Sequence, residues 1–522
     1  MKPLPASLLL APLLLVGSVG TYAASRAHPG LGDAATALQP SSGAVDSPAL
    51  EASLATVEAR EIRSDLFFLA SDELGGRDSP SPELKIAARF IAARLERLGF
   101  TPGAPNGWFY EYPLDFAAID PDETKITVTT PTGEVITTWR YGKDYFGFLR
   151  LNETLDVEGT AVFVGAESEE AFENPALEGR WAITLVTGRK EDPKYRSVRG
   201  WAKSAGAIGV LRVQAPGVED DLAARFGTQV RRSIQGSLTY PSPESDRARS
   251  TVEPSVPFEQ VTTAALERAV AGLGGIAALE PGSVLPFTVH EARRTSPLGE
   301  SVTLENVCGF WPGSDPELAN EVIVITAHYD HVGRRGDGES GEVVYNGADD
   351  NGSGTSGLLA VAEGLAARGP LKRSVLLMWV SAEEKGLFGS EAWTKKPWLP
   401  GEARPICDLN IDMIGRNAPD YLLITPSRDH DAYSGLTRLA ERCAALEGFP
   451  SLGSADAYWK RSDQVNFSEN LDLPVAFLFS DVHEDYHQPT DDPEKIDYDK
   501  IRRVSRLVLR MLDGLQEQVL DL

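Results

Sequence analysis

Cysteine is scarce in this chain of 522 residues, which has only Cys308, Cys407 and Cys443. Three cysteines so far apart in the sequence cannot build a disulfide framework or a cysteine-based zinc site. Any metal ion that this protein holds must therefore be bound by histidine and carboxylate side chains.

Positive charge is also in short supply, since 50 Lys and Arg face 76 Asp and Glu, for a formal net charge of -26. A protein this negative repels a phosphate backbone. The densest basic stretches are only pairs, Arg231 with Arg232 and Arg502 with Arg503. We therefore expect no nucleic-acid partner. The 42% of hydrophobic and 24% of charged residues are typical of a folded globular protein.

Long hydrophobic runs are absent except near the N-terminus. Lys2 precedes an apolar run at 8–16, and small residues follow up to Ala24. This order is typical of a signal peptide, and Pro12 interrupts a run that is too short to span a bilayer comfortably. We expect residues 1–24 to be a signal peptide, so that the protein is secreted or periplasmic, without a later membrane span. An uncleaved anchor is the alternative.

The remaining chain is expected to have four parts. Residues 25–55, rich in Ala, Gly, Pro and Ser, suit a linker or pro-segment. Residues 56–124 contain helical patterns at 62–69 and 83–98, and we expect ordered structure to begin near Glu58. Residues 125–292 contain short β-like runs and a segment, 202–211, in which a helix end passes through glycines into a buried strand. Residues 293–522 follow a different pattern.

That last part alternates apolar strands with helices. Strands are expected at 321–326, 374–380, 409–411, 421–424 and 475–479, and helices at 358–367, 433–446 and 501–519. The alternation predicts an α/β fold with a mostly parallel central sheet that is flanked by helices.

Polar residues stand where three of these strands end. The first strand leads to His328 and Asp330, the second to the adjacent Glu383 and Glu384, and the third to Asp412. In an open α/β sheet, ligands bind at the carboxyl ends of the strands. We therefore expect these side chains to meet in one crevice, with the acidic turn at 346–352 and the segment at 483–492 nearby.

Carboxylates that crowd together repel one another, and a buried unpaired one costs several kcal/mol. Two divalent cations about 3.5–4 Å apart, sharing an activated water, would resolve this conflict. Histidine and carboxylate without cysteine suit catalytic zinc. One of the two adjacent glutamates would remain free to act as a general base.

Five motifs in this order carry a family resemblance: HYD at 328–330, GADDNGSG at 347–354, SAEEKGLFGSEAW at 381–393, NIDMIG at 410–415 and YHQPTDD at 486–492. Together they resemble the M28 family of zinc metallopeptidases, which includes bacterial leucyl-type aminopeptidases. The likeness covers Glu58 to about Phe116 and Thr303 to the C-terminus. Residues 125–292 resemble the protease-associated (PA) domain, a small α/β module inserted in several exported hydrolases.

The resemblance implies a site with two zinc ions per chain. Glu383 would pass a proton from the bridging water to the leaving amine, and Asp330 would orient the imidazole of His328. Asp349 would bridge the two ions, and a cis peptide bond would follow it, between Asp349 and Asp350. The terminal ligands would be His328, Glu384, Asp412 and His487.

Two neighbouring histidines and one departure from the family pattern need separate expectations. His331 and His483 are expected to be structural or to contact the ligands. Gln464 follows Asp463 where the family usually has a histidine, which puts a substrate-positioning role for residues 462–467 in doubt.

Two motifs match the signatures of other kinds of enzyme, but their surroundings in the sequence argue against both. His483 to His487 matches the H-E-x-x-H signature of helical zincins, but a strand precedes it and Pro489 follows, leaving little room for a helix. Residues 352–357 match G-x-G-x-x-G, but a dinucleotide fingerprint should follow a strand directly, and here Asp349 and Asp350 would compete with a pyrophosphate. A serine α/β-hydrolase is disfavoured because no G-x-S-x-G elbow is present.

We therefore expect an exported di-zinc exopeptidase, an aminopeptidase acting on peptide or protein substrates, with a PA-like insert. Three alternatives on the same fold stay open: a carboxypeptidase, a glutaminyl cyclase-like enzyme with one zinc, and a non-catalytic receptor-like protein. The residues around Glu383 and Glu384 favour the peptidase. A receptor-like protein would be expected to lack some of the metal ligands, and none of the expected ligands is missing.

Overall fold

A computed structural model describes residues 47–147, 155–187, 195–218, 220–241, 256–336, 343–517, 519, 520 and 522. The expected signal peptide and residues 25–46 of the expected linker lie outside these ranges. Ordered structure begins earlier than Glu58, because α1 (Pro48–Thr56) is capped by the Ser47 side chain and packs against a helix of the core. Among the described residues, no helix is long and apolar enough to cross a membrane.

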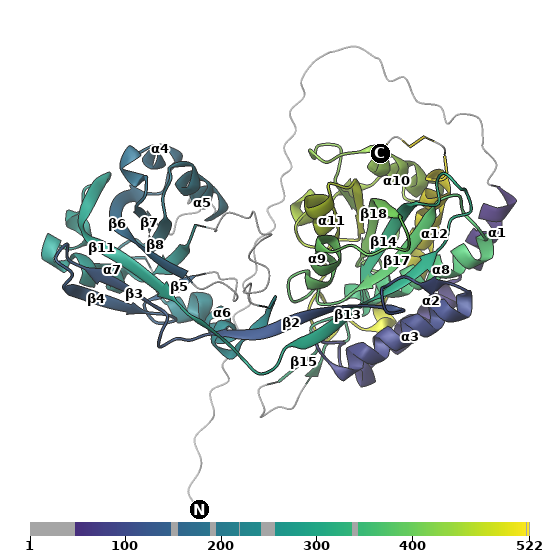
Figure 1. Ribbon diagram of the computed structural model, residues 1–522, viewed down its shortest axis with the longest axis horizontal. Helices are drawn as coiled ribbons and strands as arrows, with labels where there is room; N and C mark the ends of the chain where they lie inside the picture. Colours follow the sequence, from purple (N-terminus) through teal and green to yellow (C-terminus); the bar gives the residue numbers. More distant parts are fainter. Residues whose placement is uncertain are drawn as a thin grey trace, which may run out of the picture. The chain divides into compact units, whose positions relative to one another are not determined.

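A sheet of eleven strands forms the centre of the main part (Figure 1). Its path runs through β12 (Thr295–Pro297), β2 (Phe109–Ile119), β13 (Val302–Trp311), β17 (Ser374–Val380), β14 (Glu321–His328), β18 (Arg404–Asp412), β21 (Val475–Phe479), β19 (Leu423–Thr425) and β20 (Gly453–Ser454). The strands β1 (Thr101–Pro102) and β9 (Ser237–Thr239) pair with β13 and β2.

The four central strands, β17, β14, β18 and β21, are parallel, as the alternation of strands and helices predicts. Antiparallel strands extend the sheet on both sides, with β13 and β2 beyond β17 and with β19 beyond β21. The added strand β2, which contains Pro113, was not among the expected strands. The expected α/β class is confirmed, with a mixed sheet whose parallel centre is buried on both faces.

Helices cover both faces of this sheet. One group packs around α8 (Gly354–Arg368) and consists of α1, α2 (Ala59–Leu69), α3 (Pro82–Leu98) and α12 (Tyr498–Gly514). A second group, α9 (Phe388–Lys395) and α11 (Gln464–Leu471), packs together against β13, β18 and β21. The helix α10 (Gly435–Leu446) contacts β21 and α12. A short ribbon pairs β15 (Arg334–Arg335) with β16 (Val343–Val344).

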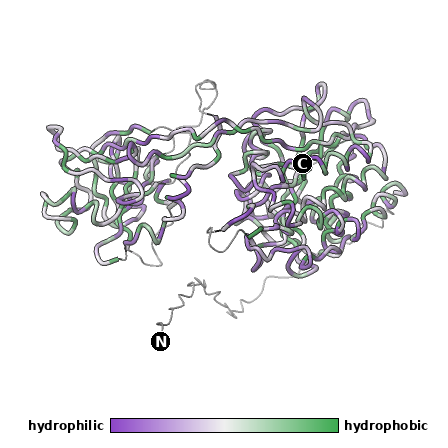
Figure 2. Tube along the Cα trace, turned by 90° about the horizontal axis from the view of Figure 1, so that it is seen from below, coloured by the Kyte–Doolittle hydropathy of each residue, from purple (hydrophilic) through white to green (hydrophobic). Residues whose placement is uncertain are grey.

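A second sheet of eight strands is built from residues between Lys125 and Arg293. Its order is β4 (Val135–Arg140), β3 (Lys125–Thr129), β11 (Ser283–Arg293), β6 (Leu155–Ala166), β7 (Trp181–Val186), β8 (Gly209–Gln214), β10 (Phe258–Val261) and β5 (Tyr145–Gly147). The helices of this region are α4 (Glu169–Phe172), α5 (Tyr195–Ser204), α6 (Leu222–Gln235) and α7 (Thr263–Val270). Figure 2 shows hydrophobic and hydrophilic stretches that follow one another along the chain.

The site is positioned by the ends of the central strands. Three of these parallel strands end at Val380, His328 and Asp412, so their carboxyl ends lie at one edge of the sheet. The chain enters α8 on the same side through a tight turn over Ala348–Ser353, which begins after Gly347 in the left-handed region at φ 57°.

Candidate metal centre

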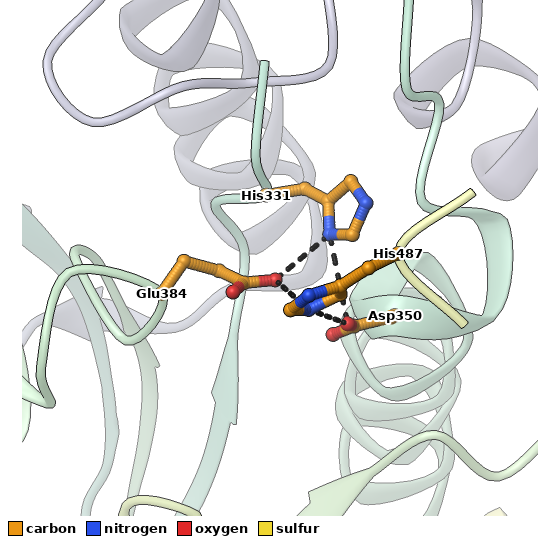
Figure 3. A group of neighbouring side chains, drawn as sticks. All are labelled: His331, Asp350, Glu384 and His487. Carbon is orange, nitrogen blue, oxygen red and sulfur yellow. Dashed lines mark hydrogen bonds and ion pairs between the residues drawn. The ribbon is translucent and has the colours of Figure 1, made fainter. Parts of the chain in front are cut away.

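Two groups of histidine and carboxylate side chains lie at this edge of the sheet. The first consists of His331, Asp350, Glu384 and His487 (Figure 3). The second consists of His328, Glu383 and Asp412. Within each group the possible ligand atoms lie within 4.8 Å of one another. Five of the seven expected site residues belong to these two groups. A sixth, Asp330, lies beside His328.

Asp350 joins the two groups. Its Oδ1 atom lies 3.3 Å from Nε2 of His328, and its Oδ2 atom lies 3.0 Å from Nε2 of His487. The same Nε2 atom of His328 is 3.2 Å from Oδ1 of Asp412. One carboxylate therefore presents an oxygen to each group, which is the arrangement that a bridging ligand requires.

Asp349, the expected bridge, belongs to neither group. Its Oδ1 atom accepts a hydrogen bond of 2.7 Å from the Gly415 amide, and its Oδ2 atom lies 3.2 Å from Nε2 of His483. The non-proline cis peptide is also one residue further on, between Asp350 and Asn351. The geometry therefore corrects the sequence expectation by one residue, because the turn directs the Asp349 side chain toward Gly415 and the Asp350 side chain toward the histidines.

The turn that carries both aspartates is held by Asp491. The amides of Asp349 and Asp350 both donate to its carboxylate, at 3.0 and 3.1 Å for Oδ2. Asp491 is fully buried, and burial together with the neighbouring charge of Asp349 raises its pKa to about 6. Within the described ranges it makes no hydrogen bond or ion pair with an imidazole, and it serves the backbone of the turn.

Asp330 contacts His328, although mainly through its backbone. The Nδ1 atom of His328 donates to the Asp330 carbonyl at 3.2 Å, whereas the nearest carboxylate oxygen is 3.7 Å away. This hydrogen bond holds the ring so that Nε2 of His328 is turned toward Asp350 and Asp412. The Asp330 carboxylate instead accepts from the Ser79 hydroxyl at 3.0 Å and from the Glu383 amide at 3.1 Å. It therefore positions the turn that carries Glu383.

An arginine from the N-terminal region supports the same loops. Arg77 is fully buried, and its guanidinium donates only to backbone carbonyls. The acceptors include Tyr329, between His328 and Asp330, and Asn346 with Gly347, at 2.9 Å each. The sequence pattern did not single out this residue, because its partners are distant in the chain and are backbone atoms.

Burial and neighbouring charges separate the carboxyl groups of the site. Burial raises the pKa of Glu383 well above its ordinary value, and the charges of Glu384, Asp463 and Asp412 add to this shift. The charge of His328 opposes it. Burial also acts to raise the pKa of Asp350, but hydrogen bonds from His328 and His487 lower it well below its usual range.

Glu384 has its pKa shifted in the opposite direction to that of Glu383. Its burial is outweighed by His331 and His487, which lower its pKa. The pKa of His487 is raised to about 9, because Asp350 and Glu384 outweigh the effect of burial. Glu383 is thus set apart from Asp350 and Glu384 as the carboxyl group that most readily holds a proton.

Residues 462–464 support Asp412. The Ser462 hydroxyl donates to Oδ2 of Asp412 at 2.8 Å, and Asn410 donates to both Ser462 and Gln464, at 2.8 and 3.1 Å. Gln464 also donates to the Trp459 carbonyl at 2.8 Å. The glutamine that departs from the family pattern therefore has a structural place behind Asp412.

The two misleading motifs do not form the structures that they would need. No helix is assigned to residues 483–487, and only His487 of the two histidines joins a group, while His483 faces Asp349. The glycines at 352 and 354 follow the turn that carries Asp350, and α8 begins at Gly354. Neither a helical zincin site nor a strand-linked dinucleotide loop is present in these described segments.

The donor set fits two zinc ions. Each group offers nitrogen and oxygen donors without sulfur, and the two groups share Asp350. Buried carboxylates that meet imidazoles and one another, with few hydrogen-bond donors, are stabilised when a divalent cation binds between them. The donors therefore agree with the expectation of zinc.

A pocket opens onto both groups. His328, Asp350, Glu383, Glu384 and Asp412 form its polar wall. The opposite part of its lining is largely apolar and consists of Met413, Tyr458, Phe477, Phe479, Val482 and Tyr486. Arg461 adds a cation to the lining.

Comparisons with known proteins agree with this geometry. Residues 306–512 match the family model described as peptidase family M28. The chain is 31% identical over 177 residues to leupeptin-inactivating enzyme 1 of Streptomyces exfoliatus. This alignment covers 34% of this chain and 35% of that protein. It is 29% identical over 197 residues to aminopeptidase YwaD of Bacillus subtilis (strain 168), with coverage of 36% and 40%.

Among solved structures, an aminopeptidase from Aneurinibacillus sp. strain AM-1 has a TM-score of 0.50 and 20% identity. The match covers 91% of this chain and 97% of that one, and it supports the fold. The aligned region spans only about a third to two fifths of the two curated relatives.

Proposed function

Because residues 306–512 of this chain are a peptidase family M28 region, we propose that the protein is a two-zinc exopeptidase that removes residues from the amino end of peptides. The observation that carries this proposal is the pair of adjacent donor groups joined by Asp350, with Glu383 beside them. The bridging ligand is Asp350 in place of Asp349. One ion is held by His328 and Asp412, and the other by Glu384 and His487.

Zinc in such a site polarises the scissile carbonyl and lowers the pKa of bound water toward about 7. The chain supplies the proton transfer, and Glu383 is the residue for it. Its carboxyl lies in the group with His328 and Asp412, and burial raises its pKa, so that it can accept a proton and return it to the leaving amine. The Asp330 carboxylate positions Glu383 by accepting a hydrogen bond from the Glu383 amide, and the Asp330 carbonyl positions His328 by accepting from its Nδ1 atom.

The pocket lining supports a preference for a hydrophobic terminal residue. Met413, Phe477 and Phe479 belong to one buried apolar cluster, against which Tyr458 and Tyr486 pack. An aliphatic or aromatic side chain seated there would remove its apolar surface from water, at about 25 cal/mol per Å².

The amino end is the proposed point of attack because of what the relatives are described as. Two relatives are described as an aminopeptidase and as a leupeptin-inactivating enzyme. One observation favours a carboxypeptidase as second candidate, namely that Arg461 lines the pocket and could bind a terminal carboxylate.

A panel of short peptides tests both candidates. The full chain, with and without a metal chelator, is assayed on a free peptide, its N-acetylated form and its C-terminally amidated form. An aminopeptidase cleaves the free and amidated peptides, spares the acetylated one, and loses activity with the chelator. Cleavage of the acetylated peptide but not of the amidated one would assign a carboxypeptidase, and activity that survives metal removal would refute the two-zinc proposal.

We also propose that the protein is exported and secreted or periplasmic, with residues 1–24 as signal peptide and the following residues, up to Asp46, as linker or pro-segment. Residues 56–124 and 293–522 would be the two parts of the peptidase domain, with residues 125–292 as a PA-like insert. Support for the insert comes from its separate eight-stranded sheet and apolar core. N-terminal sequencing of the exported protein would test the signal peptide.

A further inference from the structure

His331 lies in the same group as three of the proposed metal-binding residues, although the family resemblance assigns it no metal. Its Nδ1 atom is 3.0 Å from Oε1 of Glu384 and 3.7 Å from Oδ2 of Asp350. Nε2 of His487 lies 3.1 and 3.0 Å from the same two oxygens (Figure 3). Two imidazole nitrogens and two carboxylate oxygens therefore face one small volume.

The spacing of these four donors matches a tetrahedral zinc site. Zinc binds nitrogen and oxygen at about 2.0–2.2 Å, so the donors of a tetrahedral site lie roughly 3.3–3.6 Å apart. The four distances measured here, between 3.0 and 3.7 Å, bracket that value.

His331 is fixed in this position and has no competing partner. Its side chain is fully buried, and its backbone amide donates to the Arg77 carbonyl at 3.2 Å. A Cβ atom on Gly347 would come within 2.4 Å of its ring, so the ring packs directly against that glycine. Apart from the Glu384 and Asp350 oxygens named above, neither ring nitrogen has a hydrogen-bond partner among the described residues.

We propose that His331 is a fourth protein ligand of the ion held by Asp350, Glu384 and His487. This inference rests on the two-zinc site of the proposed function. The two ions then differ, because one has four protein donors and the other has only His328, Asp412 and the shared Asp350. Closed four-donor sites are typical of tightly held zinc, and three-donor sites keep a position open for water or substrate. Glu383 lies in the three-donor group, where it can reach that water.

A zinc titration of the full chain tests the inference. The metal-depleted protein is titrated with zinc against a chromophoric chelator, for the wild type and for His331→Gln. Glutamine keeps a hydrogen-bond donor for Glu384 but is a poor zinc ligand. Replacing a residue that only hydrogen-bonds to a metal ligand typically weakens metal binding by about 10- to 100-fold. If His331 is itself a ligand, one of the two binding steps should weaken by more than this, and the other should stay within a few-fold of wild type. Unchanged binding of both ions in His331→Gln would overturn the inference.

His483→Gln is the matched control. This second buried histidine lies 3.2 Å from Asp349 and outside both groups. Both binding steps should stay within a few-fold of wild type, and an equal loss in both variants would count against a ligand role for His331. Absence of zinc binding by the wild type would instead refute the two-zinc proposal itself.

A measurement on the wild type covers the case in which His331→Gln does not fold. X-ray absorption at one equivalent of zinc counts the imidazoles around the tighter ion. Two imidazoles are expected from His331 and His487, whereas one would overturn the inference.

Discussion

Replacing each of two adjacent aspartates should identify the residue that bridges the metal ions. In Asp350→Asn, the side chain loses the charge that faces His328 at 3.3 Å and His487 at 3.0 Å. A charge-assisted contact is worth about 1.5–3 kcal/mol, and every 1.4 kcal/mol is about tenfold in affinity. Because each ion loses one such contact, we expect both zinc-binding steps to weaken by about 10- to 100-fold.

Asp349→Asn is the matched control for this experiment. The asparagine oxygen can still accept from the Gly415 amide, as Oδ1 of Asp349 does at 2.7 Å. We therefore expect a loss of about 1–2 kcal/mol in the free energy of unfolding and zinc affinities within a few-fold of wild type. Competition titration with a chelator measures both affinities. Loss of both ions in Asp349→Asn, with full binding in Asp350→Asn, would refute the assignment of the bridge.

Three further predictions concern other buried groups. Glu383→Gln should keep two zinc ions per chain, by elemental analysis, and lower kcat by about 10²- to 10⁴-fold; substantial turnover would contradict its role. Arg77→Lys should cost about 3–5 kcal/mol of stability, because several carbonyls lose their donor, and should also weaken zinc binding about tenfold. The control is Arg373→Lys, because Arg373 is also buried and donates to the Leu515 carbonyl at the opposite end of the sheet. This variant should lose stability but keep its zinc affinity. Equal losses of zinc affinity in the two variants would be evidence against Arg77 as a positioning residue. Burial and the charge of Glu259 raise the pKa of Glu291 from 4.5 to about 8, so its stabilising contribution is complete below pH 4.5 and is lost as pH rises to about 8. Glu291→Gln should flatten this fall in thermal melts between pH 5 and 9, and an unchanged profile would contradict it.

Much of the central sheet could be predicted because burial on both faces leaves a clear pattern. The strands β17 and β21 have the predicted bounds, and their residues are all buried. The short helices α9 and α11 and the strand β2 were missed. Each of them depends on partners that are distant in the sequence, as β2 does because it lies between β13 and β12.

The place of a candidate site residue follows most directly from the sequence where that residue ends a strand. His328 and Asp412 are the last residues of β14 and β18, so the direction of the sheet determines where they lie. Asp349 and Asp350 lie in a turn, where neighbouring side chains point in different directions and the sequence does not indicate which one faces the histidines. His331 follows a strand end by three residues and was equally ambiguous, while Arg77 acts on backbone carbonyls that no motif records.

The partners of each buried acid distinguish the proposed ligands from their supports. Asp330 and Asp491 accept hydrogen bonds from amides or a hydroxyl, so protein donors already compensate their charge. Asp350 and Glu384 face imidazole nitrogens instead. An imidazole whose other nitrogen donates to a carbonyl, as in His328, presents a lone pair to the carboxylate, and two acceptors repel unless a cation or proton lies between them. A metal ion therefore belongs where carboxylate and imidazole acceptors converge, and the acids with amide donors hold the turns that bring them together.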